Sequence, residues 1–144
     1  MIAKIRAANL EDYESVMRLY GDFVGDTERF LVLGNDSYRE FIKDPDCRLD
    51  IAEMSGEIVG FIAFSIRRVI RYPKPILEVE EFYVESDKRR QGIGRELMNR
   101  AIEFARTKNC EYIFLASSKD RKEVHGFYKT NNFNEYAFHF RRTP

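Results

Sequence analysis

The sequence has no tryptophan, two cysteines and four prolines, and it has no apolar run near the roughly 20 residues that a transmembrane helix needs. Cys47 and Cys110 lack metal-ligand spacing, and two thiols cannot form the disulfide framework of a small secreted domain. The N-terminus does not resemble a cleavable signal segment. We therefore expect a globular, cytoplasmic protein with reduced thiols, no metal and no membrane association.

Charge of one sign is also missing, because 24 Lys and Arg residues balance 24 Asp and Glu residues. This balance argues against nucleic acid as a partner, and the one basic stretch with interleaved aromatics, residues 67–74, is better explained as a charged strand edge. With 144 residues the chain fits one domain, residues 1–144. Any anion site should therefore be local.

The hydrophobic periodicity alternates between that of strands and that of helices. It predicts strands at Ile2–Ala7, Asp50–Met54, Glu57–Val69, Ile76–Val84, Tyr112–Ala116 and Phe133–Arg141. It predicts helices from Leu10 with Asn9 as cap, over Asp36–Lys43, from Ile93, and over Arg121–Thr130. Because Tyr112–Ala116 follows a helix, it should run parallel to the strand that ends at Val84. The predicted fold is α/β: a mixed, mostly antiparallel sheet of six to seven strands with about four helices and one parallel pair.

Glycine and arginine are concentrated between Val84 and the helix that begins at Ile93, in the segment Arg89-Arg90-Gln91-Gly92-Ile93-Gly94-Arg95. Backbone N–H groups at a helix N-terminus favour phosphate, and glycine lets the backbone approach its oxygens. The dinucleotide fingerprint fails because Leu97 occupies its third glycine position, and the P-loop fails because no Gly-Lys-Ser/Thr follows. The segment therefore predicts a different phosphate-bearing ligand.

This segment resembles the signature of the GNAT superfamily of N-acetyltransferases, which is Arg or Gln, two residues, Gly, one residue, then Gly or Ala. A second resemblance lies downstream, with Asn132 and Val124 where the family usually has glycine and alanine. The downstream residues that match are Ser118, Arg121, His125, Phe127, Tyr128 and Phe133. The resemblance spans roughly residues 2–140. It implies a GNAT-like fold with the parallel strand pair at the acetyl-CoA site, and acetyl-CoA as co-substrate of an N-acyltransferase.

The resemblance also implies roles for individual residues. Phe82, Tyr83 and Val84 should hydrogen-bond the pantetheine arm like an added strand. The pyrophosphate should be bound by Arg89, Arg90, Gln91, Gly92, Ile93, Gly94 and Arg95. Tyr128 matches the family tyrosine that protonates the departing thiolate, and its alternative role is an aromatic contact beside Phe127. Arg121 and His125 are interpreted as structural polar residues.

A base is needed because an alkyl amine, with a pKa of about 10.4, is almost wholly protonated at neutral pH. Glu78, Glu80 and Glu81 are the candidates, with Glu80 preferred. Strict strand alternation puts Glu78 and Glu80 on one face and Glu81 on the other, unless a bulge intervenes. The alternative is that these carboxylates are solvated or pair with arginines at 67, 68 and 71.

These observations predict an N-acetyltransferase that moves an acetyl group to a primary amine of a small molecule by direct attack in a ternary complex. The alternatives are a protein N-terminal or lysine acetyltransferase and a non-catalytic acyl-CoA-binding sensor. The sequence specifies neither the acceptor, nor a preference for another acyl-CoA, nor the oligomeric state. A homodimer formed through exposed strands would be common in such a family.

Overall fold

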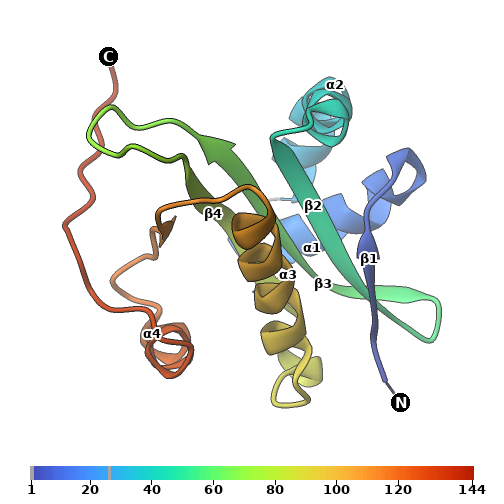
Figure 1. Cartoon of the computed structure of the whole chain (residues 1–144). Coiled ribbons are helices and arrows are strands. Elements are labelled where there is room, and N and C mark those ends of the chain that lie inside the picture. The colour runs from blue at the N-terminus through green and yellow to red at the C-terminus, as the bar shows by residue number, and fades with distance from the viewer. Residues whose placement is uncertain (1, 26) are drawn as a thin grey trace. The chain divides into compact units, whose positions relative to one another are not determined.

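The computed structural model describes residues 2–25 and 27–144, apart from the side chains of residues 27–33. The chain divides into two compact units, residues 1–114 and residues 115–144, which are taken in turn. The first unit contains β1 (Lys4–Ala7), η1 (Leu10–Asp12), α1 (Tyr13–Val24), α2 (Thr27–Lys43), β2 (Cys47–Met54), β3 (Glu57–Arg67), β4 (Ile76–Val84), η2 (Ser86–Lys88), α3 (Ile93–Thr107) and most of β5 (Ile113–Leu115) (Figure 1).

The strands form one sheet in the order β1-β2-β3-β4-β5. β1 to β4 pair antiparallel with their neighbours, and β5 runs parallel to β4, as predicted. The N–H of Leu77 donates to the carbonyl of Tyr112 at 3.0 Å where β5 approaches β4. The expected six to seven strands are wrong, because the sheet of the described residues has five.

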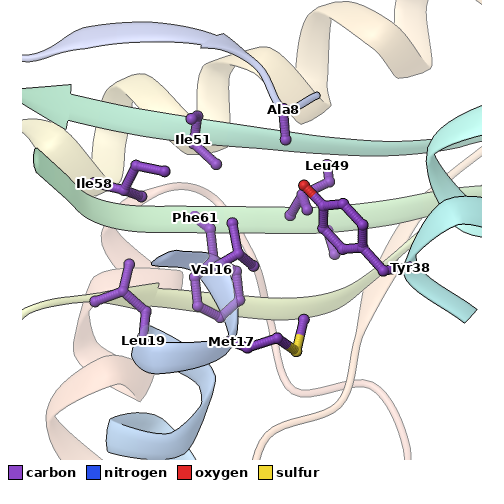
Figure 2. Packing of buried hydrophobic residues seen from close by; sticks show 10 residues of the cluster. Ala8, Val16, Met17, Leu19, Tyr38, Leu49, Ile51, Ile58 and Phe61 are labelled. Carbon is purple, nitrogen blue, oxygen red and sulfur yellow. The ribbon is translucent and has the colours of Figure 1, made fainter. Parts of the chain in front are cut away.

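Helices cover both faces of this sheet, with α3 in front of the strands and α1 behind them in Figure 1. Side chains from α1, β2 and β3 form the core on the α1 side, where Figure 2 shows Val16 and Leu19 near Phe61. On the other face, the ring of Phe64 packs 5.4 Å from that of Phe104 on α3. Alternation of buried residues along β3 therefore supplies both cores.

Several predicted boundaries agree with the structure. Asn9 caps η1, with its side chain accepting from the Glu11 N–H at 2.9 Å, and β4 and the start of α3 are confirmed. α2 is longer than predicted, since it begins at Thr27 and runs through Gly34. A Cβ at Gly34 would lie 2.5 Å from the Tyr13 hydroxyl. Glycine there permits close packing against α1, and does not end the helix.

The second unit holds the end of β5, α4 (Lys122–Thr130) and an extended segment to the C-terminus. The predicted strand at Phe133–Arg141 is wrong, because these residues form no ladder in the structure. Phe138 and Phe140 are exposed. Alternating aromatic residues become a strand only when they pair with the backbone of a neighbouring strand. Besides the end of β5, the described element of this unit is the helix α4, which offers no such edge.

Candidate functional site

The turn that precedes α3 has the backbone geometry of an anion site. Arg90 and Gly92 both adopt left-handed conformations, with φ of 64° and 85°. The first helical hydrogen bond runs from the Glu96 N–H to the Gly92 carbonyl at 3.0 Å. The N–H groups of residues 92–95 therefore precede the first intrahelical donor and point out of the helix start. Successive N–H groups in such a turn form an anion-binding concavity.

The surroundings of this turn suit a diphosphate. A Cβ built on Gly92 has no atom within 4 Å, so the space beside the backbone is open. Arg90, Gln91 and Arg95 are exposed around it. Backbone amides, the positive end of α3 and two exposed guanidinium groups are therefore available to the oxygens of one ligand.

Arg89 has a different role from its neighbours, because its head group is held by the protein. Its Nε–H donates to the carbonyl of Val84 at 2.8 Å, and its guanidinium lies 5.5 Å from the centroid of the Tyr83 ring. Arg89 therefore ties the turn to the end of β4. These contacts give Arg89 a structural role. Its binding of the pyrophosphate stays a prediction.

Arg18 on α1 supports the same end of β4 from the other side. It donates to Glu85 Oε1 at 3.0 Å and to the Ile58 carbonyl at 3.1 Å. From the sequence, Arg18 is indistinguishable from an ordinary surface residue, and it does pair with Asp22 at 3.7 Å, four residues on along an exposed helix face. Sequence patterning detects that helical spacing and not the long-range bond.

The predicted pantetheine segment lies where β4 extends past β5. Phe82, Tyr83 and Val84 pair on one edge with residues 60–62 of β3. β5 has only three residues and approaches β4 near Leu77. The outer edge of β4 at Tyr83 and Val84 therefore runs beyond β5, in the place where an extended, amide-bearing chain can add as a strand.

A β-bulge changes the orientation of the three candidate carboxylates. Ala63 of β3 pairs with Glu81, whereas Phe64 pairs with Val79, so Glu80 is the extra residue of the bulge. Glu78 pairs with Ser65, two residues from Ala63. Glu78 and Glu81 therefore share one face, because the bulge that strict alternation left as an exception is present.

Each of the three carboxylates has its own environment. Glu78 accepts from Arg67 Nε at 3.0 Å, as the alternative interpretation expected. Desolvation raises the pKa of Glu80, the hydrogen bond from Ser65 lowers it, and the charge of Glu78 raises it further, with a net increase. Glu81 accepts a hydrogen bond from the hydroxyl of Tyr20 on α1. Sequence analysis missed Tyr20, whose position on the buried face of α1 is typical of core residues.

Tyr128 lies on α4 in the second unit, half-buried between aromatic rings. The centroids of Phe127 and Phe133 are 6.0 and 5.9 Å away, so the aromatic contact named as its alternative role exists. Burial raises the pKa of Tyr128 to about 12, against the opposing charge of Arg121. The phenol is therefore protonated at neutral pH.

His125 has the structural contacts expected of it. Its Nε2 lies 3.1 Å from Ser117 Oγ and 2.9 Å from the Ser118 carbonyl. These bonds join α4 to the segment that precedes it.

Among the described residues we find neither an activated thiol nor a metal-binding cluster. Burial raises the pKa of both thiols, that of Cys47 to about 11, so neither is an activated nucleophile. Within the described parts of the chain, no group of three His, Cys, Asp or Glu side chains could hold a metal ion. No helix among them is long and apolar enough to cross a membrane.

Comparison with known sequences gives a family match over most of the chain. The model of the acetyltransferase (GNAT) family matches residues 11–133. An uncharacterized N-acetyltransferase of Archaeoglobus fulgidus is 26% identical over 135 residues, which are 90% of this chain and 91% of that protein. Another, from Methanocaldococcus jannaschii, is 33% identical over 86 residues, which are 59% of this chain and 38% of its own length.

Solved structures share the fold over nearly the whole chain. A protein of Bacillus halodurans described as a transcriptional regulator superposes with a TM-score of 0.90 at 26% identity, covering 98% of this chain and 99% of its own. An aminoglycoside N-acetyltransferase in complex with CoA superposes with a TM-score of 0.81 at 19% identity, covering 98% and 99%. At that identity, the second likeness shows the fold alone.

Proposed function

The chain belongs to the acetyltransferase (GNAT) family, and on that premise we propose that it transfers the acetyl group of acetyl-CoA to a primary amine of a small molecule. The observation that carries the proposal is the turn at residues 89–95. Its left-handed Arg90 and Gly92 turn the amides of the α3 N-terminus outward, directly after the strand that a pantetheine arm would join. A diphosphate linked to an extended amide chain matches both features.

The chain's own residues would divide the binding of this co-substrate among them. Acetyl-CoA supplies an activated thioester when bound. Arg90, Gln91 and Arg95 would surround its pyrophosphate together with the amides of Gly92, Ile93 and Gly94. Tyr83 and Val84, with Phe82, would hold the pantetheine arm by backbone hydrogen bonds. A backbone N–H near Val84 would stabilise the carbonyl oxygen as its negative charge grows.

Direct attack in a ternary complex requires a neutral amine, and Glu80 is the proposed base. Its raised pKa brings its proton affinity closer to that of a working base at neutral pH. Glu78 is engaged by Arg67 in an ion pair at 3.0 Å. Glu80 would remove the proton directly or through a water molecule.

Tyr128 is the proposed donor to the leaving sulfur. A phenol with a pKa of about 12 is protonated at neutral pH and can donate a hydrogen bond. Complete proton transfer to a thiolate, whose conjugate acid has a pKa of about 8.5, would be uphill. The hydrogen bond from Tyr128 would therefore stabilise the developing thiolate before solvent protonates it.

One similar structure bears on the class of acceptor, and another bears on a second candidate function, the binding of acyl-CoA without catalysis. An aminoglycoside acetyltransferase shares the fold, which makes a small cationic amine the first acceptor class to test ahead of a protein amino group. The Bacillus halodurans structure described as a transcriptional regulator favours, as second candidate, a protein that binds acyl-CoA without turnover.

The deciding experiment measures free-thiol release from acetyl-CoA against a panel of small amines, aminoglycosides and peptides. We expect release that depends on a small amine and is lost on Glu80→Gln, while Glu57→Gln, on the exposed start of β3, behaves like the wild type. Binding of acetyl-CoA with no thiol release in the presence of any acceptor would instead support the second candidate, a protein that binds acyl-CoA without turnover.

A further inference from the structure

Glu85 is the first residue after β4, and it begins the loop that leads to the turn at residues 89–95. Its N–H donates to the Val59 carbonyl at 2.9 Å, and its own carbonyl accepts from the Lys88 N–H at 3.0 Å. The Nε–H of Arg89 returns to the carbonyl of Val84, the residue before Glu85, at 2.8 Å. These bonds place a carboxylate beside the segment proposed to bind a diphosphate.

The side chain of Glu85 is held by an arginine from another element. Arg18 of α1 donates to Glu85 Oε1 at 3.0 Å and, through its second terminal nitrogen, to the Ile58 carbonyl at 3.1 Å. Strand alternation puts Glu85 on the same face as Tyr83, whose ring lies 5.2 Å from that of Phe23 on α1. Because α1 and α3 cover opposite faces of the sheet (Figure 1), the carboxylate is directed to the face opposite α3.

A carboxylate in this loop would repel a diphosphate if its charge were left uncompensated, because exposed charges interact over about 8 Å at physiological salt. The loop holds a second carboxylate, that of Asp87, which pairs with its neighbour Lys88 at 3.4 Å. Glu85 is compensated from α1 instead. The side chains of Arg18 and Glu85 are 50% and 21% exposed, and an ion pair of this kind adds little to stability. Its larger effect should therefore be on a bound anion.

We propose that Arg18 is a positioning residue for the co-substrate, which neutralises Glu85 and holds its carboxylate toward α1 and away from the diphosphate. The inference rests on the proposed function and adds to it a residue that acts on acetyl-CoA through Glu85. Arg18 also pairs with Asp22, an exposed carboxylate one turn along α1, at 3.7 Å. These two partners allow a charge beside the turn to be distinguished from a charge on the helix.

The test is calorimetric titration of the full-length protein with acetyl-CoA. Arg18→Met removes the charge and keeps a long side chain. It is measured alone, together with Glu85→Gln, and together with Asp22→Asn. The two double variants have the same net charge, so a difference between them depends on where the carboxylate was removed.

We expect Arg18→Met to weaken acetyl-CoA binding about fivefold, the size expected for one uncompensated charge near a diphosphate in a largely aqueous setting. Adding Glu85→Gln should restore the affinity to within about twofold of the wild type, because the two residues act as a coupled pair. Adding Asp22→Asn should leave the loss in place. The loss should fade in about 1 M salt, where the screening length is about 3 Å.

Two further measurements distinguish this role from general support of the fold. In turnover, Arg18→Met should raise the KM for acetyl-CoA and leave kcat unchanged. Urea unfolding should give nearly the same free energy for Arg18→Met as for the wild type, because the ion pair is partly exposed.

Three results would overturn the inference: unchanged binding by Arg18→Met, equal restoration by Glu85→Gln and Asp22→Asn, or the same loss at low and high salt. The proposed function is tested separately, by acetyl-CoA binding and thiol release in the wild type. A wild type that binds and turns over acetyl-CoA, with no rescue of Arg18→Met by Glu85→Gln, would refute the role of Arg18 and keep the acetyltransferase.

Discussion

The Nε–H of Arg89 donates to the carbonyl of Val84 at 2.8 Å, so the turn before α3 is bonded to the last residue of β4. The same guanidinium lies over the ring of Tyr83. One arginine therefore joins the two segments assigned to the coenzyme, the anion-binding turn and the strand edge. Its neighbour Arg90 is exposed and its side chain extends from the turn as a charge.

Replacing these two arginines by lysine should separate geometry from charge. Arg89→Lys keeps the charge but not the planar group that both bonds the carbonyl and covers the ring. We expect the Kd of coenzyme A to rise about tenfold, from loss of roughly 1.5 kcal/mol. Arg90→Lys should stay within about twofold of the wild type by the same titration, because a solvated phosphate contact tolerates lysine. If Arg89→Lys also stayed within about twofold of the wild type, Arg89 would act through its charge alone.

The pH profile of turnover should identify the base. Because desolvation raises the pKa of Glu80, kcat/KM should fall on the acidic side at a higher pH than for an ordinary carboxyl group. Glu80→Gln should remove that acidic limb and lower the rate by about 100-fold. Glu78→Gln should keep the limb and shift it to lower pH, because it removes a neighbouring negative charge. Wild-type profiles for Glu78→Gln, Glu80→Gln and Glu81→Gln would eliminate a strand carboxylate as base.

Tyr128→Phe should separate binding from chemistry. It keeps the ring contacts with Phe127 and Phe133 and removes only the hydroxyl. We expect acetyl-CoA to bind normally and kcat to fall by about 10- to 100-fold, from the loss of one hydrogen bond to the developing thiolate, which is worth roughly 1.5–3 kcal/mol. Single-turnover measurements would give the rate directly, and an unchanged rate would remove Tyr128 from the mechanism.

A stability prediction concerns Asp12, the buried last residue of η1, where Arg6 binds Asp12 at 2.8 Å and Glu53 at 2.9 Å. The hydrogen bond from Arg6 lowers the pKa of Asp12, against desolvation. A lowered folded-state pKa gives stability that is present above the unfolded value of about 3.9 and lost as pH falls through the folded one. Asp12→Asn should therefore cost about 1 to 3 kcal/mol at pH 7 and much less in acid.

Urea unfolding at neutral and acidic pH measures this difference. Asp22→Asn is the matched control, because Asp22 belongs to an exposed ion pair with Arg18 at 3.7 Å and should change the free energy of unfolding little. Equal losses for Asp12→Asn at both pH values would contradict the assignment to ionised Asp12.

Local sequence was sufficient for features that depend on neighbouring residues. The cap at Asn9, the bounds of β4 and the glycine turn before Ile93 all follow from residues within one or two turns of the chain. The pairing of β5 with β4 followed from the handedness of the connection.

Features that depend on a partner strand or helix could not be predicted in the same way. The bulge at Glu80 exists because β3 pairs with Val79 and Glu81 and skips the residue between them, which β4 alone does not encode. Tyr20 and Arg18 contact residues more than 30 positions away. Phe133–Arg141 has the alternation of a strand without the ladder.

Calorimetric titration of acetyl-CoA decides whether the turn at residues 89–95 binds the pyrophosphate. Gly92→Glu introduces a negative charge at a left-handed residue with φ of 85°, and Gly56→Glu makes the same change at the hairpin turn between β2 and β3, with φ of 81°. Both side chains would enter open space, so their backbone strain is matched. We expect tight binding by the wild type and Gly56→Glu and none by Gly92→Glu; equal binding by all three, or no binding by the wild type, would show that this turn is not the pyrophosphate site.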